Sequence, residues 1–298
     1  MTSPIHHTNC PLCKSASIGK VLAAKDHTVS GETFAIWECA DCTARFTQDA
    51  PGAGDIGRYY RSENYISHTN TRRGLVNKLY HRVRTITLAQ KRNLIKKVTG
   101  LNTGHLLDIG AGTGLFVDAM RKAGWKVTGL EPDEQARRRA GEMNIVLNDA
   151  ADLFSLHPAS FNAITLWHVL EHVHDVHGYL VQAAKLLQPG GKLVVAVPNY
   201  TSADAQAYSE YWAAYDVPRH LYHFSPAAMR KLLQQHGFQV TSLHPQWFDS
   251  FYVSLLSEQY KTGRSNLLKG AWNGFTSNMK ALGAAAKCSS VIYVSAKI

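Results

Sequence analysis

The stretch Leu106-Leu107-Asp108-Ile109-Gly110-Ala111-Gly112-Thr113-Gly114 decides the fold of this chain. It reads as an apolar strand that runs into a turn with glycines at three alternate positions. A second strand, 127–130, ends at the acidic residue Glu131. Glycine adopts positive φ and lets the backbone approach a ligand closely, and an acid after the next strand can accept hydrogen bonds from both hydroxyls of a ribose. The two features together predict a site for a ligand that carries adenosine.

The spacing of the glycines distinguishes between the cofactors that carry adenosine. A dinucleotide site needs glycine at the first, third and sixth positions, but the sixth position here is Leu115. Asp108 repels a pyrophosphate and suits a cationic amino-acid group. The pattern resembles the first two motifs of class I S-adenosylmethionine (SAM) dependent methyltransferases. This resemblance implies that the cofactor is held by Asp108, Gly110, Ala111, Gly112, Gly114, Glu131 and Pro132.

Two later segments resemble further motifs of the same family. Asn148-Asp149-Ala150 resembles the third motif, which implies that Asp149 and Ala150 lie at the adenine. Asp152 is the competing choice for this contact, and otherwise it caps the following helix. Trp167 and His168 end the fourth strand of the pattern, where the resemblance places the methionine portion of SAM. A zinc site at His168 and His172 on one presumed helix is disfavoured, because zinc proteases need Glu directly after the first His.

The segment after the fifth strand is dense in aromatic and cationic side chains and contains Pro218-Arg219-His220, which resembles one methyltransferase subgroup. This composition predicts that the segment contacts the substrate. Because histidine titrates near neutral pH, we expect the general base to be His168 or His220. An equally weighted alternative is that Arg219 pairs with Asp216 and holds the loop. The predicted substrate residues are Tyr211, Trp212, Arg219 and Tyr222.

Four of the five cysteines form two C-x-x-C pairs, Cys10/Cys13 and Cys39/Cys42. Two such pairs can deliver four thiolates to a zinc ion with a closed tetrahedral shell. We therefore expect a structural zinc, with chance pairing as the alternative. Cys288 stands apart and is expected to be a small buried residue.

The fold class predicted for the whole chain is α/β. Strands at 105–109, 126–130, 144–147, 162–167 and 192–197 alternate with helical stretches, and two strands follow at 238–243 and 290–295. We expect a Rossmann-like, seven-stranded, mostly parallel sheet with an antiparallel last strand. The predicted units are a zinc-ribbon-like module at 1–50, a helical cap at 51–102, and a methyltransferase domain at 103–298 with insertions at 200–224 and 247–287.

Composition limits the kinds of partner that the chain can bind. The 298 residues carry a formal charge of +10, and nine basic residues but no acidic one lie between Tyr65 and Leu107. Such a surface attracts phosphate groups, or it is simply a solvated helix face. No apolar run is long enough to span a membrane, and the N-terminus lacks a signal-peptide pattern, so we expect a cytoplasmic location. The apolar insertion at 247–287 covers the core, pairs with another subunit as a homo-oligomer, or touches a membrane surface.

The predicted function is methyl transfer from SAM to an oxygen atom of a small molecule, with anionic molecules among the candidate acceptors. A first alternative is methylation of ribosomal RNA, in which the basic cap contacts phosphates. A second alternative is a SAM-binding scaffold protein without catalysis.

Overall fold

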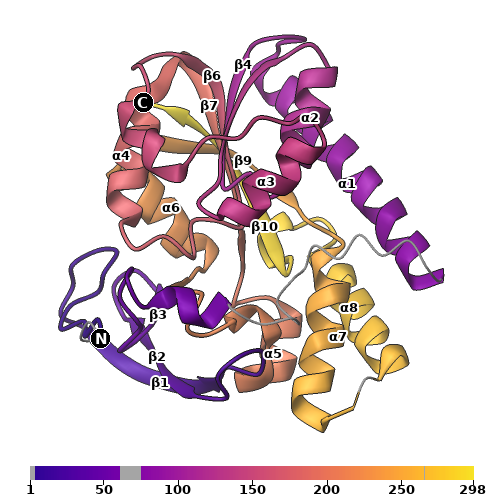
Figure 1. Ribbon diagram of the computed structural model, residues 1–298. Coiled ribbons are helices and arrows are strands. Elements are labelled where there is room, and N and C mark those ends of the chain that lie inside the picture. Colours follow the sequence, from indigo (N-terminus) through magenta and orange to yellow (C-terminus); the bar gives the residue numbers. More distant parts are fainter. Residues whose placement is uncertain (1–3, 61–74, 265) are drawn as a thin grey trace.

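Two sheets organise the chain in the computed structural model, which describes residues 4–60, 75–264 and 266–298 (Figure 1). The larger sheet has six strands in the order β5-β4-β6-β7-β10-β9. Four neighbouring strands are parallel, and the last strand of the chain runs antiparallel to both of its neighbours. The strands are β4 (His105–Ile109), β5 (Lys126–Leu130), β6 (Phe161–Trp167), β7 (Leu187–Pro198), β9 (Phe238–Pro245) and β10 (Ser290–Lys297).

Helices cover both faces of this sheet, because its strands are apolar on both sides. On one face Leu106 packs with Phe116 and Met120 of α2 (Leu115–Lys122) and with α1 (Leu75–Thr99). On the other face Leu107 belongs to the cluster that includes α4 (Val176–Leu186) and α6 (Pro226–Gln235). α3 (Glu134–Glu142) lies beside the β5 edge. The α/β architecture predicted from the alternating pattern is therefore confirmed.

The predicted seventh strand at 144–147 does not form. Asn144 has a φ of 57° and Val146 is 84% exposed. Backbone in the left-handed region cannot continue an extended strand. In the part of the chain that the structure describes, this segment gives only an isolated bridge between Leu130 and Asn148, so the sheet has six strands and not seven.

The N-terminal residues build the smaller sheet, which lies below the larger one in Figure 1. Its order is β1-β2-β3-β8, with β1 (Ile18–Lys25), β2 (Thr33–Cys39), β3 (Arg45–Thr47) and β8 (Tyr222–His223). The fourth strand comes from the predicted insertion at 200–224, and Arg45 pairs with His223. The N-terminal sheet is thus completed by a strand that lies 175 residues later in the chain, between β7 and α6.

The remaining elements lie where the sequence predicted a cap and two insertions. The expected cap corresponds to η1 (Ile56–Tyr60) and α1, whose Leu94 and Val98 pack against the core; the side chains of Leu75 and Leu79 lie outside the described residues. No helix in the described ranges is long and apolar enough to cross a membrane. The other helices are η2 (Ala150–Ser155), α5 (Ala203–Tyr208), η3 (Ser209–Tyr211), η4 (Ala213–Tyr215), α7 (Asp249–Thr262), α8 (Leu267–Ala281) and η5 (Ala285–Lys287).

Candidate active site and metal centre

The glycine loop after β4 takes the conformation that its sequence predicts. Gly110, Gly112 and Gly114 have φ values of 72°, 56° and 75°. A Cβ atom on Gly110 would lie 2.4 Å from Val169, and one on Gly114 would lie 2.6 Å from Ile145. Gly112 has nothing within 4 Å on its Cβ side. Two of the glycines are therefore required by close packing, and the third leaves the backbone open to a ligand.

Two buried carboxylates flank this loop. Glu131 accepts hydrogen bonds from the backbone N–H of Gly112 (2.7 Å) and of Asp133 (2.9 Å), which fix its carboxylate beside the loop. Asp108 accepts a hydrogen bond of 2.6 Å from the Thr165 hydroxyl. Burial raises the pKa of both carboxyl groups, that of Asp108 to about 7. The two acids lie at the carboxyl ends of β4 and β5, where open parallel sheets bind their ligands.

Asp149 lies after the bridge between Leu130 and Asn148. Its side chain accepts a hydrogen bond from the Ala151 N–H and pairs with Arg137 at 2.9 Å. It is the N-cap of η2, so the capping role predicted for Asp152 belongs to Asp149. Ala150 is the first residue of that helix.

Lys91 enters the site from α1, which the sequence analysis treated only as part of a basic stretch. Its Nζ atom lies 4.2 Å from the centroid of the Trp167 ring. Burial lowers the pKa of Lys91, while the nearby carboxylates of Asp108 and Asp249 oppose that shift. The signal was available, because Lys91 lies on the same helical face as Leu88 and the fully buried Ile95.

His168 follows Trp167 in a strained backbone conformation, with a φ of 57°. Its Nε2 atom lies 3.0 Å from Asp249, and its Nδ1 atom lies 3.3 Å from Glu171. Burial lowers the pKa of His168, but the two carboxylates outweigh it and raise the pKa to about 10. An imidazole with this pKa is protonated at neutral pH and cannot accept a further proton. The segment from His168 to His172 is a turn and not the presumed helix, since α4 begins only at Val176.

Glu171, His172 and His220 form a compact group, which we call the acceptor cluster. One ligand atom from each residue lies within 4.8 Å of the others. The Glu171 carboxylate is fully buried, and neither of its oxygens has a hydrogen bond among the described residues. A buried carboxylate without a hydrogen bond needs an explanation, and a catalytic role or a bound group is one. His168 is its ion-pair partner, and this contact lowers the pKa of Glu171 against the effect of burial.

Backbone carbonyl groups fix the tautomers of both histidines in the acceptor cluster. The Nδ1 atom of His172 lies 3.0 Å from the Arg219 carbonyl, and that of His220 lies 2.8 Å from the Ala214 carbonyl. Since a carbonyl only accepts hydrogen bonds, Nδ1 must donate in each ring, and Nε2 keeps its lone pair. Burial and the neighbouring His220 lower the pKa of His172 to about 4. The cluster can therefore accept a proton or hold a divalent cation through two nitrogens and a carboxylate.

Two of the four predicted substrate residues, Arg219 and Tyr222, contact this cluster through their backbone, but most of the four side chains are engaged within the protein. Trp212 is buried and donates to Asp204, and Tyr222 is buried and donates to the His174 carbonyl. Arg219 is 1% exposed and pairs with Asp26 at 2.9 Å and with Asp216 at 2.6 Å. These contacts support the alternative in which Arg219 holds the loop. Tyr211 is half-buried in η3.

Tyr60 is a neighbour of the acceptor cluster that the sequence analysis missed. Its hydroxyl oxygen lies 3.1 Å from the Nδ1 atom of His172, and burial raises its pKa. It ends η1, far from any recognised motif, so no pattern in the sequence pointed to it.

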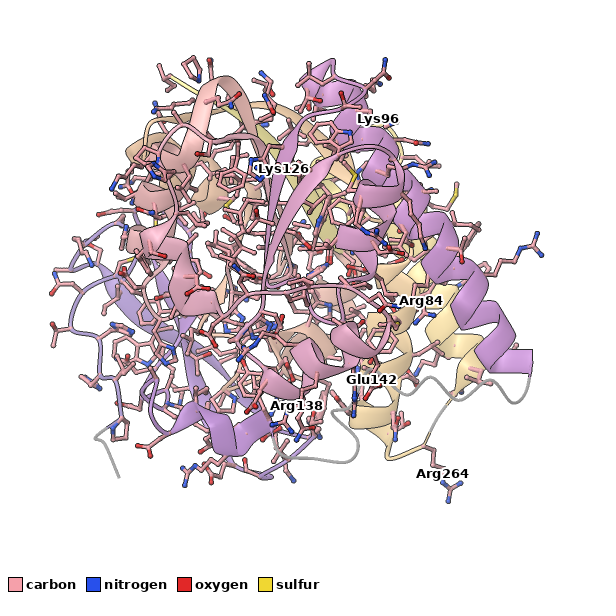
Figure 2. The ribbon with its side chains drawn as sticks, turned by 45° about the horizontal axis from the view of Figure 1, so that its top comes forward. Arg84, Lys96, Lys126, Arg138, Glu142 and Arg264 are labelled. Atoms are coloured by element: carbon pink, nitrogen blue, oxygen red, sulfur yellow. The ribbon has the colours of Figure 1, made fainter. Side chains whose placement is uncertain are left out.

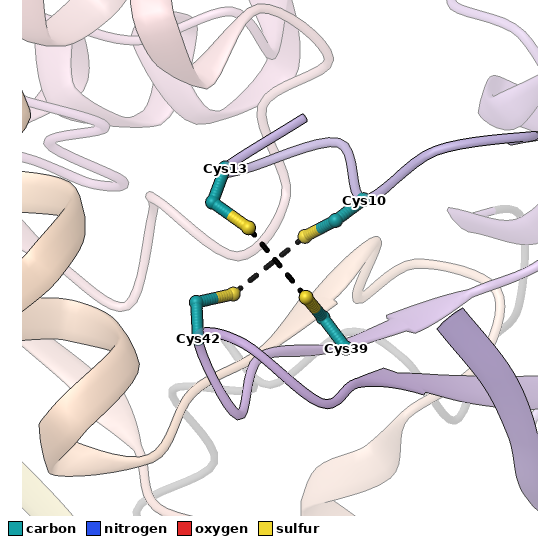
Figure 3. A group of neighbouring side chains, drawn as sticks. All are labelled: Cys10, Cys13, Cys39 and Cys42. Carbon is teal, nitrogen blue, oxygen red and sulfur yellow. Dashed lines mark hydrogen bonds between the residues drawn. The ribbon is translucent and has the colours of Figure 1, made fainter. Parts of the chain in front are cut away.

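The four cysteines of the two pairs converge at one point (Figure 3). The Sγ atoms of Cys10 and Cys42 lie 3.6 Å apart, and those of Cys13 and Cys39 lie 3.5 Å apart. Zinc–sulfur bonds of about 2.3 Å in a tetrahedron separate the sulfurs by about 3.8 Å. No disulfide joins them, so the spacing and the donor set fit a zinc ion. The Pro11 carbonyl, which lies between Cys10 and Cys13 in the chain, accepts a hydrogen bond of 2.9 Å from the Nε2 atom of His177 in α4.

Comparisons with known proteins identify the family of this chain. Residues 77–243 match the family described as "Methyltransferase domain". A ubiquinone biosynthesis O-methyltransferase from Pectobacterium carotovorum is 27% identical over 194 residues, which cover 61% of this chain and 79% of that protein. The enzyme of the same name from Xanthomonas euvesicatoria is 31% identical over 151 residues, which cover 46% and 63%. The corresponding enzyme from Sodalis glossinidius is 31% identical over 114 residues, so the chain spans about half of it (36% of this chain and 46% of that protein).

Solved structures include a SAM-dependent methyltransferase from Archaeoglobus fulgidus, with a TM-score of 0.49 and 17% identity over 75% of this chain and 100% of that chain. Phosphoethanolamine N-methyltransferase 2 from Haemonchus contortus gives a TM-score of 0.48 and 17% identity over 70% of this chain and 52% of that chain. The family match covers more than half of the chain and includes the glycine loop, Glu131 and the acceptor cluster. The chain therefore belongs to the methyltransferase-domain family and is a class I SAM-dependent methyltransferase.

Proposed function

We propose that this enzyme methylates a hydroxyl oxygen of a small molecule that binds beside the acceptor cluster. The observation that carries the proposal is the fully buried Glu171 carboxylate, which has no hydrogen bond among the described residues and lies beside His172 and His220. Its negative charge beside the two imidazole rings would stabilise the imidazolium that forms when a histidine takes the proton of an acceptor hydroxyl. The relatives named as O-methyltransferases act at oxygen, which supports the same choice here.

In this proposal the loop and the two acids hold SAM, which supplies an electrophilic methyl group. Glu131 accepts from the ribose hydroxyls, the open backbone of Gly112 lies against the ligand, and Asp149 with Ala150 borders the adenine. Asp108 and Lys91 offer opposite charges to the ammonium and carboxylate ends of the methionine portion. Trp167 and His168 line the side that leads to the acceptor cluster. Alignment of acceptor and methyl donor of this kind contributes about 7–11 kcal/mol to catalysis.

The acceptor hydroxyl must lose its proton, and His220 is the residue we assign to receive it. Its Nδ1 atom is fixed by the Ala214 carbonyl, so its Nε2 lone pair is available. His168 was the other predicted base, but its position between Asp249 and Glu171 keeps it protonated, and we assign it the positioning of Glu171. Tyr211 remains a proposed contact with the acceptor, while the contacts of Trp212, Arg219 and Tyr222 favour a structural role.

We also propose that Cys10, Cys13, Cys39 and Cys42 bind a structural zinc ion, because four thiols at tetrahedral spacing fit that ion and leave no open position. The partition into a ribbon module at 1–50, a cap at 51–102 and a catalytic domain at 103–298 is part of this proposal. It is supported by the second sheet, three of whose four strands come from residues 1–50, with β8 contributed by the catalytic domain.

The test is methyl transfer from labelled SAM to a panel of phenols, catechols, sugar nucleotides and RNA, with mass spectrometry of the product. We expect an O-methylated small molecule. His220→Gln should lower kcat by about 10²–10⁴-fold without changing the SAM dissociation constant, and His157→Gln, at an exposed loop residue, should change neither. Label that appears only in RNA supports the RNA alternative. SAM binding without any methylated product supports the scaffold alternative.

Cofactor binding has a separate test in calorimetry. Glu131→Gln should weaken SAM binding about tenfold or more, because charged acceptors contribute about 1.5–3 kcal/mol per hydrogen bond. Glu134→Gln is the matched control, since Glu134 is exposed on α3 and pairs only with Arg138 among its described contacts. Equal affinities for the two variants would remove Glu131 from the SAM site.

A further inference from the structure

The second insertion exposes an apolar row along α8. Its side chains recur at intervals of four and three residues, so they lie on one face of the helix. Soluble proteins rarely leave a row of large apolar side chains in water unless it binds something. We call this row the α8 stripe, and its members with their exposed fractions are Leu268 (87%), Trp272 (65%), Phe275 (48%), Met279 (50%) and Leu282 (58%).

The opposite face of α8 packs on α7 so closely that the stripe cannot turn inward. A Cβ atom on Gly270 would lie 2.8 Å from Leu255, and one on Gly274 would lie 2.8 Å from Phe251. Ser277 and Ala281 continue this buried face. The two helices lie side by side at the lower right of Figure 1, with small residues at their contact. The orientation of α8 is therefore set by its glycines, and the stripe faces away from the protein.

The surface around the stripe is positively charged. After Glu258 the sequence holds six basic residues and no acidic one up to Ile298. Lys269 pairs with the buried Glu258 at 2.9 Å. Arg264 projects outward from the α7–α8 turn in Figure 2, and α1, whose sequence also lacks acidic residues, lies on the same side of the molecule. Apart from the paired Lys269, the exposed basic residues from α7 to η5 are Lys261, Arg264, Lys280 and Lys287.

We propose that the α8 stripe and these four basic residues dock the protein on the surface of an anionic phospholipid bilayer. Trp, Phe and Leu on one helix face, flanked by Lys and Arg, are the features with which interfacial helices bind anionic lipid. Docking of a second copy of the chain is unfavourable, because it would bring together two surfaces without acidic residues. Each chain also carries a formal charge of +10, so the two copies repel each other. Nucleic acid would use the charges but leave five apolar side chains exposed.

The same hairpin connects this surface to the active site. α7 begins at Asp249, which lies 3.0 Å from His168, and Asn278 of α8 donates to the Trp247 carbonyl just before α7. α7 and α8 would therefore lie between a membrane bound at the α8 stripe and His168, which contacts Glu171 of the acceptor cluster. The docking itself does not depend on the proposed chemistry, so its test uses binding and not turnover.

The experiment is flotation of the full chain with vesicles of phosphatidylcholine alone or with 30% phosphatidylglycerol. We expect binding only to the anionic vesicles, and a steep decrease when the salt concentration rises from about 0.05 to 0.5 M. Trp272→Ser/Phe275→Ser should weaken binding at least about tenfold, because the variant lacks the two aromatic side chains that would enter the bilayer. Val146→Ser/Val181→Ser, at two exposed apolar positions outside the insertion, should bind like the unchanged protein.

A spectroscopic readout places the contact at α8. Trp272 is the exposed member of the six tryptophans, so its emission should shift to shorter wavelength on anionic vesicles. Trp272→Phe should keep binding and lose the shift. Lack of binding to anionic vesicles at low salt would overturn the proposal, as would equal binding by the Trp272→Ser/Phe275→Ser variant. A dimer in sedimentation that this variant dissociates, without vesicle binding, would assign the stripe to a second copy.

Discussion

Replacing Arg219 with methionine should destabilise the protein strongly, because the guanidinium joins the N-terminal sheet to the loop that carries His220. The side chain of Arg219 is 1% exposed and that of its partner Asp26 is 0% exposed, with 2.9 Å between them. Removing one partner of a buried ion pair costs about 3–5 kcal/mol, because the remaining charge loses its compensation. Asp26 keeps hydrogen bonds from Thr28, Val29 and Ser30, so we expect a loss near the lower end, about 3 kcal/mol.

The measurement is urea unfolding followed by tryptophan fluorescence. With an m value of about 1–3 kcal/mol/M, this loss lowers the midpoint by about 1 M or more. Arg138→Met is the matched control, since Arg138 is 74% exposed and its pair with Glu134 should contribute about 0.5 kcal/mol or less. The structural role would be refuted if Arg219→Met lowered the urea midpoint no more than the control does and also raised the KM for the acceptor. Arg219 would then be a substrate contact.

Three further predictions follow from the site. Gly110→Ala should abolish SAM binding and lower the melting temperature, because a Cβ there would lie 2.4 Å from Val169 at a φ of 72°; calorimetry and thermal unfolding measure both. The folded-state pKa of His168, about 10, lies above the ordinary value, so its contribution to stability is complete below about pH 6.5 and is lost as pH rises through about 10. His168→Gln should flatten the urea midpoint against pH between 7 and 10, and an unchanged slope would contradict the ion pairs. Metal analysis should find one zinc per chain, and a chelator or Cys39→Ser should lower the melting temperature; a metal-free protein of equal stability would exclude the zinc.

The parts of the site that depend on backbone geometry could be predicted from the sequence. The glycine loop and Glu131 could be found because positive φ values require glycine and because ligands bind where strands end. The two C-x-x-C pairs could be found because a structural zinc ion needs four donors. Lys91 was obscured by its basic neighbours, and Tyr60 has no local pattern. The side chain of Arg219 contacts Asp216 three residues away, but its other two partners, Tyr59 and Asp26, lie 160 and 193 residues away in the chain. Such long-range pairing leaves no signal in a single sequence.

The position of β8 has a consequence for how this enzyme responds to its surroundings. His220 lies two residues before the strand that completes the N-terminal sheet, and Thr47 of that sheet donates to the His220 carbonyl at 2.7 Å. Loss of the zinc ion that we propose at the four cysteines would therefore loosen His220, the residue assigned to receive the proton. Deleting the N-terminal module would leave an open strand edge beside the catalytic loop, so it cannot be removed as an independent appendage. If the cysteines bind zinc, zinc starvation or oxidation of their thiols would lower the rate of methyl transfer, because the pairing of β3 with β8 holds His220 in place.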